Sequence, residues 1–417
     1  GTKVKVWLVD CSVYFNRPGN PYLGPDGDPW HDNADRFHLF AQVAVAIATG
    51  KAVTGKTELN WQPDIVHCND WQTGLIPALL HTESLSHEQK ATTIFTIHNI
   101  AYQGLFPYST FIALGLPEEL WSSEALEFHD QVSFIKGGLV FADRVNTVSP
   151  NYAKEIQSPE YGYGLDGLLL HRSDRLSGIL NGIDDTVWNP ETDPYLKTNY
   201  DHKKLAGKKK NKAALQKEYK LPNEPNTLLV GLVGRLVHQK GIDLVINSLP
   251  ELATLPVQFV ALGTGEPAYE HALRDMARLF PKQISVNIGY DEALAHRIEA
   301  GADVFLMPSR FEPCGLNQLY SLRYGTVPIV RRVGGLADTV VDAAPETLKD
   351  KTASGIVFDN ADGESLYAAV IRAKELYQDK KIWKQIQQTG MRGESSWKHS
   401  AQQYTQLYEL AIKDCQK

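Results

Sequence analysis

The sequence VFLMPSRFEPCGLNQLYSLRY, residues 304–324, predicts a strand, a loop and a helix in direct succession. The apolar run Val304–Met307 is typical of a buried strand in a parallel sheet. Pro308 ends this strand, because proline cannot donate a hydrogen bond to the ladder. Leucines then recur at spacings of three from Leu316, which indicates a helix. The loop between strand and helix is a candidate binding site, since ligands of open α/β sheets bind beyond the carboxyl ends of the strands.

The start of the predicted helix is suited to an anionic ligand. Backbone N–H groups of Gly315, Leu316 and Asn317 would point at such a ligand, and the helix dipole favours a phosphate there. The alternative is an ordinary connecting loop with a turn proline and a cap glycine. These residues alone leave both interpretations open.

Length and composition describe a globular protein of two domains, or three small ones. The 417 residues are 43% hydrophobic and 22% charged, which is enough apolar material for sizeable cores. The formal net charge of −7 argues against nucleic acid or an anionic membrane as the main partner. No apolar run reaches transmembrane length, and residues 1–10, GTKVKVWLVD, lack the shape of a signal peptide. The four cysteines are scattered without disulfide or zinc-finger spacing, which favours a reducing compartment, either cytosol or an organelle stroma.

Strands and helices alternate along the chain, which predicts βαβ units and parallel sheets. In the first half, helices are expected at residues 32–48 and 73–81, and strands at 4–10, 63–71, 92–97, 144–148 and 176–180. In the second half, strands are expected at 227–233, 257–262, 284–288, 304–307 and 327–330. The tail, residues 397–417, is helical in pattern. The fold class that fits is α/β, with two doubly wound domains facing each other across a cleft.

The expected domain boundaries follow from these patterns. A first domain would cover residues 1–190 and a second would cover 191–395, while a C-terminal helix over 396–417 would cross back to the first domain. Residues 189–225 hold several prolines and a lysine-rich helix. A basic patch for an acidic partner is one interpretation of these lysines, but the overall acidity favours a solvated helix face.

Two cations follow the first strand of the second half. Arg235 and Lys240 lie in the stretch GRLVHQKG, residues 234–241. Two positive charges at a strand end can neutralise a diphosphate and stabilise it as a leaving group. The alternative is a pair of exposed surface cations. Glycine brackets the stretch on both sides, at Gly234 and Gly241, and this favours the functional interpretation.

A glutamate and a glycine pair follow two other strands. Glu312 could hydrogen-bond a sugar hydroxyl, or stabilise positive charge as a glycosidic bond breaks. The alternative is a structural salt bridge to Arg310. Gly334 and Gly335 would let the backbone approach a ligand closely, although many connecting loops contain such a pair.

Polar and aromatic residues gather at strand ends in the first half. Their polar groups could hold sugar hydroxyls and their rings could stack on sugar faces; the residues are Asp70, Trp71, His98, Asn99, Tyr102 and Asn181. A metal site of His67, His98 and Asp70 has no supporting spacing. The chain contains no Walker A stretch, no GxGxxG that opens a helix and no GxSxG elbow, so kinases, dehydrogenases and α/β-hydrolases lack their signatures.

Several motifs together resemble those of starch and bacterial glycogen synthases. They are HCNDWQTGL (67–75), TIHNIAYQG (96–104), NGID (181–184), GRLVHQKG (234–241), SRFEPCGLNQLYSLRYGTVPIV (309–330) and SSWKHSAQQY (395–404). The resemblance covers nearly the whole chain and implies a GT-B fold. It implies an enzyme, a glycosyltransferase that moves glucose from ADP-glucose to the non-reducing end of an α-1,4-glucan (starch or glycogen). The transfer would proceed with retention, without a cofactor or catalytic metal, in a bacterial cytoplasm or a plastid stroma.

The resemblance also implies roles for residues on the donor side. Arg235 and Lys240 would hold the donor's phosphates, and Tyr290 would lie by the adenine. The remaining donor-binding positions would be Gly234, Cys314, Gly315, Leu316 and Asn317.

Other positions would contact sugars. The transferred glucose would be bound by Glu312, Gly334 and Gly335, and His98 would contact it from the first domain. Residues near the donor sugar or the acceptor would be Asp70, Trp71, Asn99, Tyr102, Asn181 and, in the RPGNPY loop, Tyr22.

The chain departs from the patterns of its relatives in three places. Many GT-B transferases carry a second glutamate where this chain has Tyr320, as starch synthases do, so other groups must hold the donor ribose. Asn317 stands where the family usually has threonine, which keeps a polar side chain near phosphate. The family begins with a strand and a Lys-Thr-Gly-Gly or Lys-Val-Gly-Gly loop that reaches the donor, and this sequence contains neither, which suggests a truncated front.

Two other functions remain open at this stage. The first is a GT-B transferase that uses another nucleotide sugar, such as UDP-glucose. The second is a non-catalytic glucan-binding or scaffold protein that lacks the front loop.

Overall fold

The structure, a computed structural model, describes residues 4–25, 27–51, 61–83 and 91–415. They form two compact units. The first unit comprises the residues up to Val148, Ala153–Gly178, and the residues from Tyr404 onward. The second comprises Ser149–Tyr152 and Ile179–Gln403.

The division between the units lies at Gly178, before the expected boundary at residue 190. The residues that follow Gly178 pack on the second unit, which explains the difference. Ile183 forms a parallel bridge with Ser396. Trp188 stacks on Tyr320, with ring centroids 3.8 Å apart and planes at 10°.

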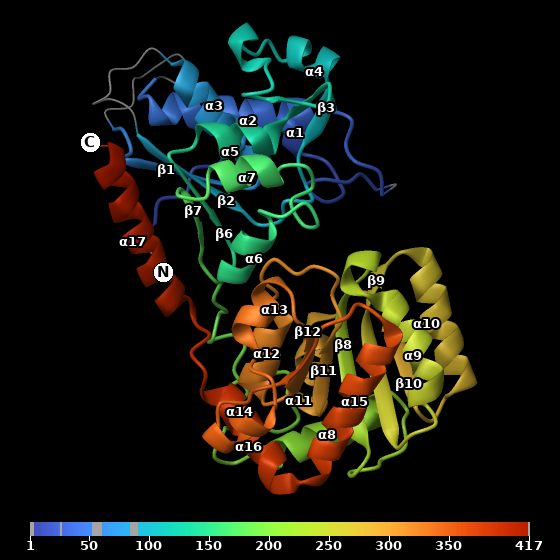
Figure 1. The fold of residues 1–417 in the computed structure, drawn as a ribbon. Coiled ribbons are helices and arrows are strands. Elements are labelled where there is room, and N and C mark those ends of the chain that lie inside the picture. The colour runs from blue at the N-terminus through green and yellow to red at the C-terminus, as the bar shows by residue number, and fades with distance from the viewer. Residues whose placement is uncertain (1–3, 26, 52–60, 84–90, 416–417) are drawn as a thin grey trace. The chain divides into compact units, whose positions relative to one another are not determined.

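The first unit is built on a parallel sheet with the strand order β1-β2-β6-β7. Its strands are β1 (Ile65–Asn69), β2 (Thr92–Ile97), β6 (Arg144–Thr147) and β7 (Leu176–Gly178). All six residues of β2 are buried, as expected of a central strand covered on both faces. The helices around it are α1 (Ser12–Phe15), α2 (Asn33–Ala48), η1 (Trp71–Thr73), α3 (Leu75–Thr82), α4 (Tyr108–Ala113), η3 (Glu118–Leu120), α5 (Phe134–Phe141) and α7 (Asp166–His171) (Figure 1). Helix α6 (Pro150–Glu155) begins in the second unit and ends in the first.

A small antiparallel sheet in the first unit escaped the sequence analysis. It has the order β3-β5-β4 and consists of β3 (Leu105–Pro107), β4 (Glu127–Phe128) and β5 (Gln131–Ser133). These strands are two or three residues long, which is too short to show a period-two pattern.

The strand expected at residues 4–10 is wrong. These residues pair with no strand among those described, and the side chains of Val4, Val6 and Leu8 are 73%, 75% and 88% exposed. The apolar run is present, but a β-strand is held by hydrogen bonds to a neighbour, and none of the described strands supplies them.

Helix α17 (Trp397–Cys415) begins in the second unit and ends in the first. Within the first unit it lies against the sheet: the hydroxyl of Tyr408 is 2.9 Å from His67 Nδ1 on β1. The guanidinium of Arg144 on β6 donates to Asp414 from Nε at 2.9 Å. The last part of the helix therefore covers strands that lie far earlier in the sequence.

The second unit is built on a six-stranded parallel sheet with the order β10-β9-β8-β11-β12-β13. The strands are β8 (Leu228–Leu236), β9 (Val257–Gly265), β10 (Ile284–Ile288), β11 (Val304–Met307), β12 (Val327–Arg331) and β13 (Ile356–Phe358). The helices are α8 (Ala206–Glu218), η4 (His238–Lys240), α9 (Ile242–Leu252), α10 (Pro267–Leu279), α11 (Glu292–Gly301), α12 (Asn317–Tyr324), α13 (Gly334–Thr339), α14 (Pro345–Asp350), α15 (Gly363–Gln378) and α16 (Lys380–Arg392).

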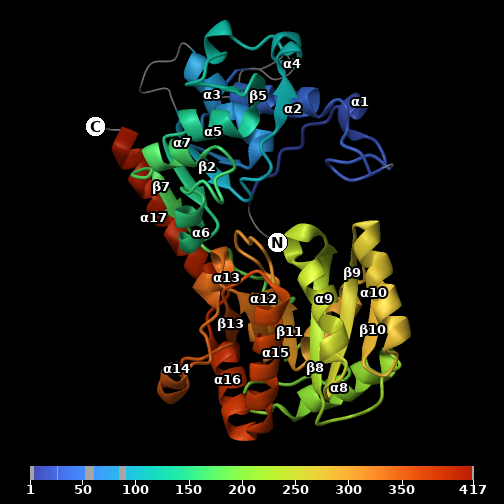
Figure 2. The ribbon, with the colours of Figure 1, turned by 45° about the vertical axis from the view of Figure 1, so that its right-hand side comes forward.

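Each face of this sheet has its own apolar core, because successive strand residues point to opposite faces. One core packs Leu228, Val230 and Leu232 of β8 against helices α9, α10, α15 and α16. The other packs Leu229 against α8, α11 and α13. Figure 2 shows α9 and α15 over the strands on the first of these faces.

The strand order changes direction between β8 and β11. From β8 the chain moves outward through β9 to β10, then returns to the other side of β8 and moves outward again through β12 to β13. Such a reversal opens a crevice beyond the carboxyl ends of the two central strands. The loops after β8 and β11 are therefore where a ligand of this unit is expected.

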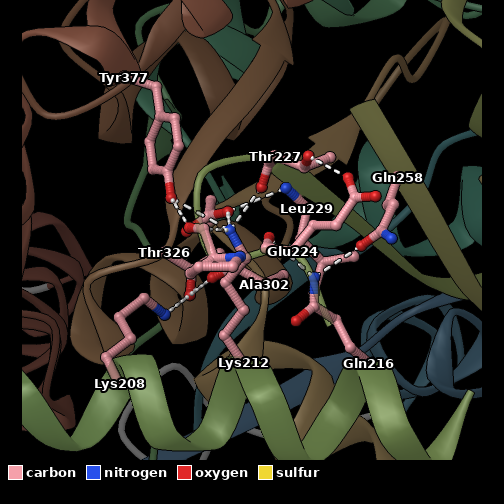
Figure 3. A network of polar contacts seen from close by, with 12 residues as sticks. Lys208, Lys212, Gln216, Glu224, Thr227, Leu229, Gln258, Ala302, Thr326 and Tyr377 are labelled. Atoms are coloured by element: carbon pink, nitrogen blue, oxygen red, sulfur yellow. Dashed lines mark hydrogen bonds and ion pairs between the residues drawn. The ribbon is translucent and has the colours of Figure 1, made fainter. Parts of the chain in front are cut away.

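The lysine-rich helix α8 is not simply a solvated face, which corrects the sequence analysis. Lys208 is buried, and its ammonium donates to the carbonyl oxygens of Glu299 and Ala300 and to the hydroxyl of Thr326. Burial lowers the pKa of Lys208 to about 7. Lys212 is buried as well, and Figure 3 shows its ammonium at the centre of a polar network. Helical spacing put both lysines on the inner face, where polar partners compensate for their burial.

Candidate active site

Strand β8 extends through Arg235, so the first predicted cation lies in the strand and not in the loop after it. Arg235 belongs to the strand and pairs with Thr264 of β9, because the two strands stay hydrogen-bonded as far as Leu236. The side chain of Arg235 is exposed, and its Nη2 lies 3.5 Å from Gln239 Oε1. Gly234 also belongs to the strand and not to a loop.

Lys240 lies in a tight turn, residues 237–241, which we call the lysine turn. The turn contains η4 and ends at Gly241, whose backbone is left-handed with φ +67°. A Cβ atom there would lie 2.2 Å from the carbonyl oxygen of Pro308. Only glycine allows the lysine turn to press this closely on the loop after β11.

Glu312 lies in that neighbouring loop, residues 308–316, which we call the glutamate loop. Its side chain is buried, and its Oε2 is 2.5 Å from Lys240 Nζ and 2.9 Å from the hydroxyl of Ser309. The alternative of a salt bridge from Glu312 to Arg310 is wrong, since Arg310 pairs with Asp243 instead. The structure thus brings an ammonium and a carboxylate together at the point where the strand order reverses.

A small pocket, with a cavity volume of about 40 Å³, opens beside these groups. Main-chain and side-chain atoms from the ends of β8 and β11 line it, including Gly234, Arg235, Lys240, Ser309 and Asn317. Both predicted cations therefore border one pocket, although they lie on opposite sides of a turn in the sequence.

Helix α12 begins at the edge of this pocket. The first N–H groups of a helix have no partner within it, and of the described side chains none caps this helix. The side chain of Asn317 donates from Nδ2 to the carbonyl oxygen of Val233 at 2.7 Å, so it ties the helix to the end of β8. Gly315, with φ +71°, makes the turn into the helix, and the side chain of Leu316 is partly exposed.

Gly334 and Gly335 approach the glutamate loop and not open space. A Cβ at Gly334 would lie 1.9 Å from the carbonyl oxygen of Glu312, and one at Gly335 would lie 2.2 Å from that of Cys314. Close packing on this loop is a sufficient reason for the glycine pair. Burial raises the pKa of the Cys314 thiol to about 11, so the thiol stays protonated at neutral pH.

Two tyrosines of the second unit differ in environment. Tyr290, which follows β10, is 86% exposed, so its ring is available for stacking. Tyr320 on α12 lies flat against Trp188, whose other face stacks on His296 at 3.8 Å and 14°.

The structure groups three of the first unit's predicted residues. Asp70 Oδ1 accepts hydrogen bonds from the backbone N–H groups of His98 at 2.9 Å and Asn99 at 3.4 Å. Burial raises the pKa of Asp70, and the positive charge of His98 opposes this shift. His98 Nε2 lies 2.9 Å from Asn69 Oδ1, a neighbour that the sequence analysis did not single out. Asp70 has φ 61°, a rare conformation for a residue with a side chain, and such strain gathers at functional sites.

The aromatic candidates of the first unit divide into one packed ring and two exposed rings. Trp71 packs edge-on against Phe37 at 4.9 Å and also lies near Phe106 and Phe134, so much of it serves the local core. Tyr102 and Tyr22 are 49% and 47% exposed, so each could offer a face to a sugar.

Asn181 does not belong with the first-half cluster, because it lies in the second unit. Its backbone hydrogen-bonds Cys314 in the glutamate loop. Its Oδ1 is buried and has no partner within the described residues.

His67 is fully engaged by protein groups. Its Nδ1 faces the hydroxyl of Tyr408 at 2.9 Å, and its Nε2 faces that of Thr96 at 2.6 Å. Burial, together with the charge of His98, lowers the pKa of His67 to about 4. In the described chain, no group of three or more His, Cys, Asp or Glu side chains is placed to hold a metal ion. No described helix is long and apolar enough to span a membrane.

The sequence analysis missed two residues that position the charged groups. Ser309 hydrogen-bonds Glu312 from three residues earlier, and its place in SRFEP was the only available signal. Asp243, in the first turn of α9, meets Arg310 of the glutamate loop. The sequence carries no signal for that contact, because 67 residues separate the two.

Two family models match the chain. The model described as starch synthase catalytic domain matches residues 1–171. The model described as glycosyl transferases group 1 matches residues 211–389.

Curated relatives are similar over nearly the whole chain. Glycogen synthase 1 of Methylococcus capsulatus is 57% identical over 412 residues, which cover 99% of this chain and 82% of the relative. The glycogen synthase of Cellvibrio japonicus is 54% identical over 408 residues, which cover 98% of this chain and 83% of the relative.

Solved structures share the fold. The catalytic domain of starch synthase IV from Arabidopsis thaliana, bound to ADP and acarbose, matches with a TM-score of 0.83 and 36% identity, over 93% of this chain and 79% of that one. Sucrose-phosphate synthase from Thermosynechococcus elongatus matches with a TM-score of 0.59 at 17% identity, over 94% of this chain and 82% of that one, which shows the fold alone. The two Rossmann-like units are those of the GT-B fold, and the resemblance drawn from the motifs is confirmed. The chain belongs to the starch and glycogen synthase family of glycosyltransferases.

Proposed function

We propose that this glycosyltransferase moves glucose from ADP-glucose to the non-reducing end of an α-1,4-glucan, with retention of configuration. The observation that carries the proposal is the pocket at the strand reversal of the second unit, which Arg235 and Lys240 both border. The related starch synthase IV, whose structure holds ADP and acarbose, supports an adenine nucleotide as donor and an α-glucan as acceptor.

The two cations suit the departure of a nucleoside diphosphate. As the bond between glucose and phosphate breaks, negative charge grows on the phosphate oxygens, and fixed positive groups lower the energy of that state. Arg235 can bind two phosphate oxygens at once, whereas Lys240 acts as a point charge. Backbone N–H groups at the start of α12, residues 315–317, add a third positive region through the helix dipole.

We assign the remaining donor contacts to residues around the same pocket. The transferred glucose meets Glu312, whose carboxylate is held by Lys240 and Ser309. Gly334 and Gly335 form the backbone beside it, and Tyr290 stacks on the adenine. Gly234 and Cys314 complete the donor set, and Asn181, with its unpartnered Oδ1, binds sugar.

A separate role belongs to the polar cluster of the first unit. We assign sugar contacts to Asp70, His98 and Asn99, and stacking to Trp71, Tyr102 and Tyr22. The raised pKa of Asp70 and its strained backbone support a functional role. His98→Ala should lower the rate of transfer, and unchanged kinetics in this variant would remove the cluster from the site.

We propose that the reaction uses no catalytic metal, because the positive charge that the diphosphate requires comes from Arg235 and Lys240. Turnover should then be the same with and without EDTA. The bacterial origins of the glycogen synthase relatives favour the cytoplasm over a plastid stroma, and cell fractionation tests this assignment.

Steady-state kinetics test the proposed function. Arg235→Ala and Lys240→Ala should each lower kcat by about 100-fold or more, as the loss of a preorganised charge does elsewhere. Lys209→Ala, an exposed lysine on α8, is the control and should retain full activity. Near wild-type turnover in either site variant would refute the assignment.

Donor competition tests the nucleotide. ADP-glucose should give a higher kcat/KM than UDP-glucose, and the reverse order would point to a different transferase. Calorimetry with ADP separates both from a scaffold protein, which would bind glucan but not ADP.

A further inference from the structure

The lysine turn and the glutamate loop are not held together by their strands. β8 and β11 pair only at Val304 with Val230 and at Phe305 with Gly231. The ladder therefore ends before either loop begins. Some other set of contacts must set the distance between the ammonium and the carboxylate at the pocket.

An ion pair next to both groups supplies such a contact. Arg310 donates from Nη1 to Asp243 Oδ1 at 2.7 Å and from Nη2 to Asp243 Oδ2 at 2.8 Å. This two-point geometry fixes orientation as well as distance. Arg310 belongs to the glutamate loop, and Asp243 follows the lysine turn in the first turn of α9.

Backbone contacts continue the join. The N–H of Arg310 donates to the carbonyl oxygen of Gln239 at 2.8 Å, and Gln239 Nε2 donates to the backbone carbonyl oxygen of Phe311 at 3.2 Å. Arg310 Nη1 also lies 3.2 Å from the carbonyl oxygen of His238. Burial alone would raise the pKa of Asp243, but its hydrogen bonds to Arg310 lower the pKa below its usual value, so the carboxylate stays charged at neutral pH.

The pair stands beside the pocket without forming its wall. Neither Arg310 nor Asp243 is among the described residues that line it. The two side chains are 24% and 29% exposed, and pairs with this much exposure contribute little to global stability. An effect on catalysis without a large effect on folding is therefore the signature to seek.

We propose that Arg310 and Asp243 are positioning residues for glucosyl transfer: their ion pair fixes the lysine turn against the glutamate loop. The inference rests on the proposed function, because it gives Lys240 and Glu312 their roles at the donor. Breaking the pair lets the two loops separate, and a displacement of about 1 Å at a catalytic group can lower the rate by about 100-fold.

Four variants test the pair. Asp243→Asn and Arg310→Gln each remove the ion pair, and the double variant completes a cycle. Arg310→Lys keeps the charge and loses the two-point geometry. The matched control is Arg297→Gln, since Arg297 of α11 forms a two-point pair of similar exposure with Glu218 of α8, at 2.9 and 2.8 Å.

Activity is expressed per ADP-binding site counted by calorimetry, so that unfolded protein does not enter the rate. We expect each single variant to lower kcat by about ten- to 100-fold with little change in KM for ADP-glucose. The double variant should lose no more of kcat than the less active single variant does, because both substitutions remove the same contact. The lysine variant should be intermediate, and Arg297→Gln should match the wild type.

Three results would overturn the inference: wild-type kcat in Asp243→Asn, additive losses in the double variant, or an equal loss in Arg297→Gln. Lys240→Ala, measured beside them, separates this failure from that of the proposed function. If Lys240→Ala is inactive while Asp243→Asn is normal, only the positioning role fails. If Lys240→Ala is itself normal, the donor site has been placed wrongly.

Discussion

Replacing Lys212 with methionine should destabilise the second unit strongly. The ammonium of Lys212 lies 2.6 Å from Asp303 Oδ2, and the two side chains are only 6% and 11% exposed. It also donates to the carbonyl oxygen of Thr227 at 2.5 Å and contacts the hydroxyl of Tyr377 at 3.1 Å (Figure 3). Methionine fills nearly the same volume, so the loss of charge and hydrogen bonds dominates over the loss of packing.

The size of the effect follows from the carboxylate that remains. Removing one partner of a buried ion pair costs about 3–5 kcal/mol, because the other charge stays buried without compensation. Asp303 keeps a hydrogen bond from the backbone N–H of Leu229 at 2.9 Å and one from the hydroxyl of Tyr377. We therefore expect a loss near the lower end, about 3 kcal/mol in the free energy of unfolding.

Urea unfolding followed by circular dichroism measures this loss. The control is Lys209→Met, three residues earlier on the same helix. Its side chain is exposed, so the free energy of unfolding should change by no more than about 0.5 kcal/mol. The double variant Lys212→Met with Asp303→Asn removes the orphaned charge and should be more stable than Lys212→Met alone. A single variant within about 1 kcal/mol of the wild type, or a double variant less stable than the single, would refute the reasoning.

Three further predictions concern other parts of the chain. Gly334→Ala should lower kcat more than about tenfold, because its Cβ would meet the Glu312 carbonyl oxygen at 1.9 Å, while Gly363→Ala, where the nearest atom is 3.4 Å away, should leave steady-state kinetics unchanged. Trp188→Ala removes a partly buried ring stacked on two others at 3.8 Å, and thermal unfolding should show a loss in the free energy of unfolding of about 3 kcal/mol, against a smaller one for Trp188→Phe. The pKa of His67 is about 4 in the folded state and about 6.5 in the unfolded state. Between these pH values only the unfolded state binds the proton, so the first unit should lose stability as pH falls from 6.5 to 4. Urea midpoints at pH 7 and pH 5 measure that slope, and a slope that persists unchanged in His67→Gln would assign it to other groups.

Much of the second unit was predictable from its sequence. The run that became β11 is short, wholly apolar and closed by Pro308, and the sheet buries all four of its residues, as expected of a central strand covered on both faces. The two cations and Glu312 were found because residues after strand ends converge at one edge of a parallel sheet. The family resemblance then supplied the chemistry.

Other features depend on contacts between distant segments, which a local pattern cannot show. The run at residues 4–10 is apolar enough for a strand, yet it forms one only if a neighbouring strand pairs with it. Lys208 and Lys212 were predicted to lie on the surface, because the carbonyl oxygens and the carboxylate that accept their hydrogen bonds lie far along the chain. The Arg310–Asp243 pair was invisible for the same reason.

Helix α17 gives the order of synthesis a structural meaning. Its later residues, including Tyr408 and Asp414, pack against the sheet of the first unit, yet the ribosome makes them after every strand of the second unit. The sheet of the first unit therefore lacks this helix until the rest of the polypeptide has been synthesised. A chain truncated before Tyr404 should consequently have a first unit that is sensitive to proteolysis during translation and a second unit that is folded.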